Sequence, residues 1–243
     1  MTREPSTNRP DPIRAQEMLY RLPYHWFPEE RLKKFERQEK QRIIFDLLAR
    51  FAPETLDGYL DVGCGDGRWT FDVRQRLPAS CRAVGVDFSE RAIGFARLIA
   101  PEIEFQVQRG ESLPFEDSTF DFLTSIEVIE HVEDGSEETF LSELYRVLRP
   151  DGLMILTTPS WNLKLTQHHF RHYSVERLAD LVEEAGFEML QMRGQSIPCY
   201  GRPRWVRKRM NLFPVIWKLW RATYREVAPE KSLNLILAAR KPA

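Results

Sequence analysis

The sequence has little cysteine and no long apolar run. Its three cysteines, Cys64, Cys81 and Cys199, lie far apart without C-x-x-C spacing, which excludes a disulfide framework and a cysteine zinc site. No run of apolar residues is long enough to cross a membrane, and residues 1–14 lack the hydrophobic core of a secretory signal. We therefore expect a soluble, cytoplasmic protein with reduced thiols.

The sequence also lacks a strong net charge, an internal repeat and a low-complexity block. With 243 residues and a formal net charge of −1, it has the size and composition of one globular domain. We divide it into an N-terminal tail and lid over residues 1–28 and a main domain over residues 29–243, into which residues 202–225 are inserted.

The insertion departs from the overall charge balance, because residues 202–225 carry eight Lys or Arg and no Asp or Glu. Aromatic residues are interleaved with these cations, and Pro214 favours two short helices over a single long one. Such a segment can lie on an anionic membrane surface and deliver a lipid-linked ligand. The alternatives are an RNA backbone, a partner's acidic groove, or apolar residues that cover the sheet or a homodimer contact.

Short apolar runs alternate with helical patterns from residue 29 onward, which is typical of a parallel sheet covered by helices. Ser136 and Ser174 mark the starts of two helices, and the second ends at Gly186. The sequence therefore predicts an α/β fold, a Rossmann-like doubly wound sheet of seven mostly parallel strands with helices on both faces. The expected strands are residues 57–62, 82–87, 103–108, 120–125, 152–157, 187–193 and 232–239.

The stretch "LDVGCGDGRWT" places Gly63, Gly65 and Gly67 between a predicted strand and a predicted helix. Glycine lets the backbone approach a ligand closely, and the N–H groups at a helix start can bind a carboxylate or phosphate. Arg68 stands where a dinucleotide-binding loop has its third glycine, which argues against NAD. Asp87 ends the next strand, where an acid can accept both hydroxyls of a ribose. We expect an adenosine derivative; the alternative is a tight structural turn, with Asp87 capping a helix.

These residues resemble the class I S-adenosylmethionine-dependent methyltransferases over about residues 40–195 and the final strand. The glycine loop is followed, in the family's order, by "RGESLPFEDSTFDFL", "SIEVIEHV", "LYRVLRPDGLMILTTP" and "HYSVERLADLVEEAGFEML". The resemblance implies S-adenosyl-L-methionine as cofactor and an antiparallel last strand. One departure is Glu111, in "GES", where the family commonly has an Asp that reaches the adenine amino group. The cofactor-binding residues implied are Asp61, Gly63, Gly65, Gly67, Asp87, Phe88, Glu111, Ser112 and Glu127.

The resemblance also implies methyl transfer to a small-molecule acceptor, at a hydroxyl or an amine. Because a sulfonium methyl is already electrophilic, the enzyme must align the acceptor and remove its proton. We predict His131 and His169 as general bases, since neutral imidazole accepts a proton near neutral pH. The alternatives are that His131 ends a short helix and that His169 braces a loop. A scaffold of the same fold that transfers nothing is the non-enzymatic alternative.

The spacing of Glu127, Glu130 and His131 places two carboxylates and an imidazole on one face of a predicted helix, a set that can bind a divalent metal ion. It resembles the metal-assisted pattern of ubiquinone-biosynthesis O-methyltransferases and of small-RNA terminal 2′-O-methyltransferases, in which a metal lowers the pKa of the attacked hydroxyl. In metal-free relatives, the first acid touches the cofactor and the rest pack. The RNA enzyme is disfavoured, because "TPSWN" matches its motif loosely and the chain is not basic.

Two further groups are predicted near the site. Tyr24, His25 and Trp26 in the tail are expected to fold over it and exclude water, or else to be plain core contacts. Trp161 and the run "QHHFRHY" follow a strand end, where ligands bind in open α/β sheets.

Overall fold

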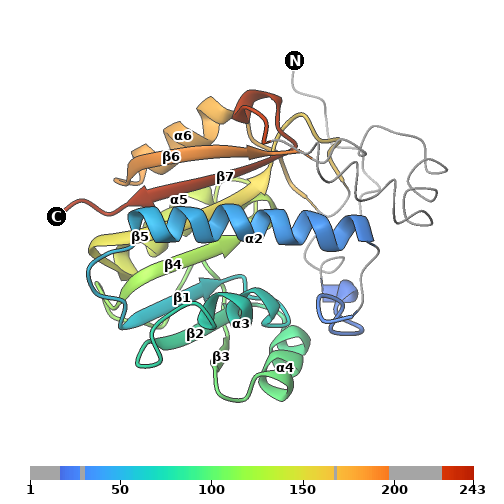
Figure 1. Cartoon of the computed structure of the whole chain (residues 1–243), viewed down its shortest axis with the longest axis vertical. Coiled ribbons are helices and arrows are strands. Elements are labelled where there is room, and N and C mark those ends of the chain that lie inside the picture. The colour runs from blue at the N-terminus through green and yellow to red at the C-terminus, as the bar shows by residue number, and fades with distance from the viewer. Residues whose placement is uncertain (1–16, 28–30, 167–168, 197–225) are drawn as a thin grey trace.

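The computed structural model describes residues 17–27, 31–166, 169–196 and 226–243 (Figure 1). Its centre is a seven-stranded sheet in the order β3-β2-β1-β4-β5-β7-β6. Strands β1 to β5 pair in parallel, and β7 is antiparallel to both of its neighbours, so the predicted doubly wound fold is confirmed. The strands are β1 (Gly58–Val62), β2 (Arg82–Asp87), β3 (Glu104–Val107), β4 (Phe120–Ile126), β5 (Leu148–Pro159), β6 (Glu188–Gln195) and β7 (Asn234–Arg240).

Helices cover both faces of this sheet. One core contains side chains of α2, α3 and α4, and the other contains side chains of α5 and α6 (Figure 1). Because side chains alternate along a strand, Tyr59 enters the first core while Leu60 and Val62 enter the second. The helices are α2 (Arg31–Phe51), α3 (Arg68–Arg74), α4 (Glu90–Ile99), α5 (Glu137–Val147), α6 (Val175–Glu184) and the short 3-10 helices η1 (Ile129–His131) and η2 (Pro229–Lys231).

Helix starts follow the predicted capping residues. The Ser174 hydroxyl accepts the N–H of Arg177 at 3.1 Å, and helix α5 begins directly after Ser136. At its other end, α5 passes straight into β5, which begins at Leu148 rather than at the expected residue 152. The stretch "RPDG" is therefore part of a long strand, although it interrupts the pairing with β4: Leu148 pairs with Phe120 and Leu153 with Phe122. Within the stretch, the N–H of Asp151 donates to the carbonyl of Lys241 at 2.8 Å.

The position of the site follows from the strand order. Strand β1 lies between β2 and β4, and the chain builds β2 and β3 on one side of it and β4 and β5 on the other. The loops after β1 and β4 therefore diverge and leave a crevice at their carboxyl ends, where open α/β sheets bind ligands. The loop after β1 contains the three predicted glycines, and the segment after β4 contains Glu127, Glu130 and His131.

The basic segment 202–225 lies outside the described residues. The described chain resumes at Glu226, which pairs with Arg42 of α2 at 2.5 Å and with Arg193 of β6. Among the described helices, none combines the length and the apolar composition that crossing a bilayer requires.

Candidate active site

The glycine loop after β1 has a backbone that other residues adopt only with strain. Gly63, Gly65 and Gly67 have φ angles of 78°, 56° and 77°, in the left-handed region that favours glycine. A Cβ at Gly63 would lie 2.9 Å from Cγ1 of Val128 and closer still to its Cγ2. At Gly65 it would lie 2.5 Å from the hydroxyl of Tyr20. Bare backbone therefore meets the crevice at Gly63 and Gly65.

Two of the predicted cofactor residues support the loop from outside the crevice. A Cβ at Gly67 would lie 2.8 Å from Phe105, so this glycine allows the start of α3 to pack closely on β3. The oxygens of buried Asp61 accept hydrogen bonds from the hydroxyls of Thr70 (2.6 Å) and Thr124 (2.7 Å). Burial raises the pKa of Asp61 to about 6, although these bonds act in the opposite direction. Direct contact of either residue with a cofactor stays a prediction.

Asp87 holds the same loop from the end of β2 and also faces the crevice. Its Oδ2 accepts the N–H of Gly65 and its Oδ1 accepts the N–H of Ser89, both at 2.9 Å. Burial raises the pKa of Asp87 to about 6, against the effect of these two bonds. Asp87 thus caps the turn into α4, as in the structural alternative. Each carboxylate oxygen retains a second lone pair for a ligand hydroxyl.

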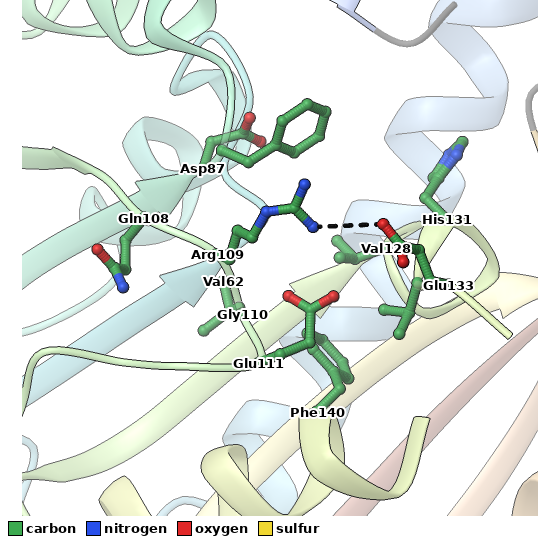
Figure 2. A pocket seen from close by; sticks show the side chains of 13 residues that line it. Val62, Asp87, Gln108, Arg109, Gly110, Glu111, Val128, His131, Glu133 and Phe140 are labelled. Carbon is green, nitrogen blue, oxygen red and sulfur yellow. Dashed lines mark ion pairs between the residues drawn. The ribbon is translucent and has the colours of Figure 1, made fainter. Parts of the chain in front are cut away.

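A first cavity of about 60 Å³ opens beside Asp87 (Figure 2). Phe88 and Phe140 provide aromatic walls, Val128 an aliphatic one, and Glu111 a carboxylate. The predicted residues Asp87, Phe88 and Glu111 are therefore brought together in one cavity. Its apolar walls with a few polar groups suit a flat heterocycle attached to a polyol.

An ion pair crosses the mouth of this first cavity. Figure 2 shows Arg109 between Asp87 and Glu133, with its guanidinium 3.7 Å from the Glu133 carboxylate. Ser112, a predicted cofactor residue, does not line either this cavity or the next one. Its N–H closes a turn by donating to the carbonyl of Arg109 at 3.3 Å.

A second cavity, of about 250 Å³, continues from the first. Both are lined by Gly63, Asp87, Phe88, Val128 and His131, so together they form one elongated crevice. One wall of the second cavity comes from residues 17–27, which we call the cover segment; it lies at the end of the sheet where β4 and β5 finish (Figure 1). The residues of the cover segment that line the cavity are Leu19, Tyr20, Tyr24 and His25.

The structure does not place the predicted metal set Glu127, Glu130 and His131 on one helix face, and metal binding by this set stays a prediction. Glu127 has a φ angle of 58° and Ile129–His131 forms only a 3-10 turn, so these residues do not share a helix face. The half-buried Glu127 carboxylate lies 2.8 Å from Nζ of buried Lys40 on α2 and accepts a hydrogen bond from Thr157 at 2.8 Å. Burial would raise the pKa of Glu127, but the Lys40 ammonium outweighs it and holds that pKa below its usual range.

His169 takes the place of Glu127 in a cluster with Glu130 and His131. One ligand atom from each of these three residues lies within 4.8 Å of the others. Glu130 is fully buried; its Oε2 accepts a hydrogen bond from Thr158 at 3.0 Å, and Oε1 has no partner within the described part of the chain. Burial, followed by the charge of Glu127, raises the pKa of Glu130 well above its usual range. The two predicted bases therefore adjoin a carboxyl group whose ionisation burial opposes.

The protonation of His169 follows from a chain of hydrogen bonds. Nδ1 of His172 lies 3.0 Å from the carbonyl of Leu163, which can only accept, so Nδ1 carries the proton. Burial lowers the pKa of His172, which keeps the ring neutral and makes its Nε2 an acceptor. Nδ1 of His169 lies 2.7 Å from that Nε2 and must donate to it. In neutral His169 the lone pair is therefore on Nε2, the tautomer that a general base requires.

Comparison with known proteins assigns the family. Residues 60–152 match the family model described as a methyltransferase domain. A probable S-adenosylmethionine-dependent methyltransferase of Mycolicibacterium smegmatis is 30% identical over 137 residues, 54% of this chain and 51% of that protein. The chain contains a class I S-adenosylmethionine-dependent methyltransferase domain.

Further matches agree with this methyltransferase domain. The ubiquinone/menaquinone biosynthesis C-methyltransferase of Geotalea daltonii is 34% identical over 120 residues, 46% of this chain and 50% of that protein. The chain thus spans about half the length of the curated relatives it matches. Phosphoethanolamine N-methyltransferase 2 of Haemonchus contortus, solved with S-adenosyl-L-methionine, shares the fold with a TM-score of 0.61 and 19% identity, over 83% of this chain and 53% of that one.

Two residues around the methyltransferase domain's crevice, Lys40 and Tyr20, were missed by sequence reasoning. Both lie outside the matched residues 60–152 and have no motif around them. His169 also lies outside that range, but it was predicted as a general base and not as a neighbour of Glu130. Lys40 lies in a helix in which ten of the 21 residues are charged, so the sequence does not distinguish this buried lysine from the exposed ones. Trp161, expected near the site, is 66% exposed and lines neither half of the crevice.

Proposed function

We propose that the protein transfers the methyl group of S-adenosylmethionine to a hydroxyl or amine of a small acceptor. The observation that carries this proposal is the position of His169. Its Nε2 tautomer is set by His172, and it lines the second cavity together with Gly63 and Asp87. A proton acceptor therefore stands in the same crevice as the groups suited to the cofactor.

The residues of the crevice fit the cofactor in shape and chemistry. S-adenosylmethionine supplies an electrophilic methyl group on sulfur. Asp87 accepts the ribose hydroxyls, and Phe88 and Val128 enclose the adenine beside Glu111 in the first cavity. The bare backbone at Gly63 and Gly65 admits the methionine portion to the second cavity.

A third cavity, of about 120 Å³, is a candidate for the acceptor side. It shares Glu127 and His169 with the second cavity and is otherwise lined by side chains of α2, the end of β5 and the start of β7. An acceptor that enters here reaches His169 and Glu127 where this cavity adjoins the second one, beside the crevice proposed for the cofactor. His169 then removes the acceptor's proton, and the neighbouring Glu127 carboxylate stabilises the imidazolium that forms.

Calorimetric titration with S-adenosylhomocysteine tests the donor half directly. We expect tight binding that Asp87→Ala weakens far more than Glu130→Ala, because Asp87 lines both cavities of the cofactor crevice and Glu130 lines neither. Equal affinity of both variants and the wild type would show that the crevice is misplaced. A metabolite screen with a labelled methyl donor then identifies the acceptor; it detects every methylated product, including carbon-methylated ones such as the name of the Geotalea relative implies.

A second candidate mechanism uses a divalent metal ion at Glu130, His131 and His169. It is supported by the 4.8 Å grouping of these ligand atoms and by Oε1 of buried Glu130, for which the described residues provide no hydrogen-bond partner. Imidazole and carboxylate ligands suit several divalent ions, which lower the pKa of a bound hydroxyl. Manganese or magnesium titrated into the S-adenosylhomocysteine complex should bind, except in Glu130→Ala and His169→Ala. Glu127→Gln should retain binding, because Lys40 already occupies that carboxylate. No binding to the wild type would eliminate the metal mechanism.

The predicted membrane contact of residues 202–225 stays a prediction, as do a homodimer and a peripheral cellular location. It is tested by sedimentation with vesicles rich in anionic lipid, from which high salt should release the protein. A protein that stays in the supernatant at low salt would point to a freely soluble acceptor.

A further inference from the structure

The cover segment is attached to the domain through one residue of the glycine loop. Asp66 is fully buried, and its Oδ2 accepts the backbone N–H of His25 at 3.1 Å. Its Oδ1 accepts a hydrogen bond from Nδ1 of the His25 ring at 2.9 Å, and its backbone carbonyl accepts one from Nε1 of Trp26 at 2.9 Å. Among the described residues, the hydrogen bonds from the cover segment to the rest of the chain all end on Asp66.

The other contacts of the cover segment lie around the same point. The Trp26 ring packs edge-on against Phe71 at 5.3 Å between centroids, and the guanidinium of Arg68 lies 4.8 Å from the Trp26 centroid. Tyr20 is buried over Gly65. The opposite side of the segment is exposed and apolar, with Leu22 59% and Phe27 50% exposed. Its attachment therefore depends on a small set of contacts centred on Asp66.

These contacts place the cover segment across the path of the cofactor. Tyr20, Tyr24 and His25 line the second cavity on the side facing Gly63 and Gly65. A ligand that fills the crevice is enclosed between the glycine loop and these rings. It cannot enter or leave on this side while His25 and Trp26 stay bonded to Asp66.

We infer that Asp66 is a positioning residue that controls cofactor exchange, by holding the cover segment over the methionine end of the crevice. The inference rests on the proposed function for the identity of the ligand. Asp66 touches His25 and Trp26 and not the crevice, so it acts through them. Opening requires three hydrogen bonds to break together, two of them to a buried carboxylate, and such charge-assisted bonds are the costly ones to lose.

The test measures association and dissociation rates of S-adenosylhomocysteine by stopped flow. Asp66→Asn should raise both rate constants, dissociation by about tenfold, because losing charge-assisted bonds makes the open state more populated. His25→Phe and Trp26→Phe remove the partners without altering the glycine loop and should act in the same direction. Asp121→Asn is the matched control, since Asp121 is a buried carboxylate that accepts two backbone N–H groups at the opposite end of β4. Faster dissociation alone, or no difference from this control, would overturn the inference.

Limited trypsin digestion separates this inference from the proposed function. The bond after exposed Arg21 lies within the cover segment. Without any ligand, Asp66→Asn and Trp26→Phe should be cleaved there about tenfold faster than the wild type, while Asp121→Asn should not. Equal cleavage in all four proteins contradicts the role of Asp66. Failure of the wild type to bind S-adenosylhomocysteine, with the cleavage difference present, contradicts only the proposed function.

Discussion

Asp61 and Glu130 are both buried carboxyl groups close to the carboxyl ends of adjacent strands, yet their surroundings differ. Each oxygen of Asp61 accepts a hydroxyl hydrogen bond, from Thr70 or Thr124. Glu130 has one such bond, from Thr158, and its Oε1 is unpartnered within the described chain. Described residues therefore satisfy both oxygens of Asp61 but only one oxygen of Glu130.

The same contrast extends to two groups of residues in and around the crevice, which we call the donor half and the acceptor half. In the donor half, formed by the glycine loop, Asp61 and Asp87, backbone and side-chain groups satisfy one another and fix the loop. In the acceptor half, formed by Glu127, Glu130, His131 and His169, a buried oxygen has unused hydrogen-bonding capacity. Satisfied buried groups fix one geometry, while unsatisfied ones cost stability and mark where a ligand completes the set. The protein's own groups fix the donor half, whereas the acceptor half contains a buried oxygen that no described residue satisfies.

The largest effect on ligand affinity is expected from a substitution in the donor half, at Gly63. Gly63→Ala forces a side chain into the left-handed region and against Val128, so we expect the affinity for S-adenosylhomocysteine to fall by more than about 100-fold in calorimetry. Gly94→Ala is the control, because Gly94 lies on α4 with open space around its Cβ. It should leave binding intact and raise the free energy of unfolding by about 0.5–1 kcal/mol. Normal affinity in Gly63→Ala would contradict a prebuilt loop.

The pH dependence of stability tests the buried carboxyl group of the donor half. The folded pKa of Asp61 is raised from 3.8 to about 6, so the unfolded state releases its proton first and the contribution of Asp61 to stability falls between those pH values. Asp61→Asn should therefore gain up to about 3 kcal/mol relative to the wild type between pH 4 and pH 7, measured by urea unfolding.

Asp121→Asn provides the opposite sign in the same measurement. Burial opposes ionisation of Asp121, but the hydrogen bond from Arg149 and two backbone N–H groups hold its pKa below the usual value. The wild type therefore gains stability as pH rises toward the unfolded value of 3.8 and keeps that gain at higher pH, so the unfolding measurement is extended below pH 4 for this variant. Asp121→Asn should lack this gain and be less stable than the wild type above about pH 4. Changes of the same sign in both variants would contradict the stated environments.

Glu130→Gln tests the buried carboxyl group of the acceptor half in the same way. Because burial and Glu127 raise the pKa of Glu130, the unfolded state ionises this group at lower pH than the folded state. The wild type therefore loses stability as pH rises above about 4.5, and the variant does not. Unfolding experiments should find Glu130→Gln increasingly more stable than the wild type toward pH 8, with unchanged S-adenosylhomocysteine affinity. If Glu130→Gln instead becomes less stable than the wild type as pH rises, Glu130 is ionised in the folded protein.

The smallest effect is expected at the mouth of the first cavity. The side chains of Arg109 and Glu133 are 52% and 51% exposed, and ion pairs this exposed contribute about 0–1 kcal/mol. Glu133→Gln should change the affinity for S-adenosylhomocysteine by less than about fivefold, with the difference vanishing at high salt. A larger or salt-independent change would assign the pair to the binding site itself.

Much of the fold was predictable because it depends on local patterns. Six of the seven strands lie within two residues of their expected ends, since apolar runs bounded by turn residues are read from the chain directly. The exception, β5, starts early because Leu148 pairs with Phe120 of β4; the strand then passes through an irregularity that contains Pro150 and Gly152, residues that locally favour a turn. Register across a sheet is a long-range property that composition does not encode.

The sequence by itself determined the glycine loop, Asp87 at the end of β2 and the alternation of strands and helices, because each follows from the backbone needs of neighbouring residues. Only the tertiary structure decided which charged side chains meet. Lys40 reaches Glu127 across 87 positions of sequence and removes it from the acid and histidine set, while His169 joins that set from beyond β5. Asp66, inside the most recognisable motif, bonds to a segment about 40 residues upstream. Side chains on separate elements interact through space, and their distances are fixed only when the helices pack on the sheet.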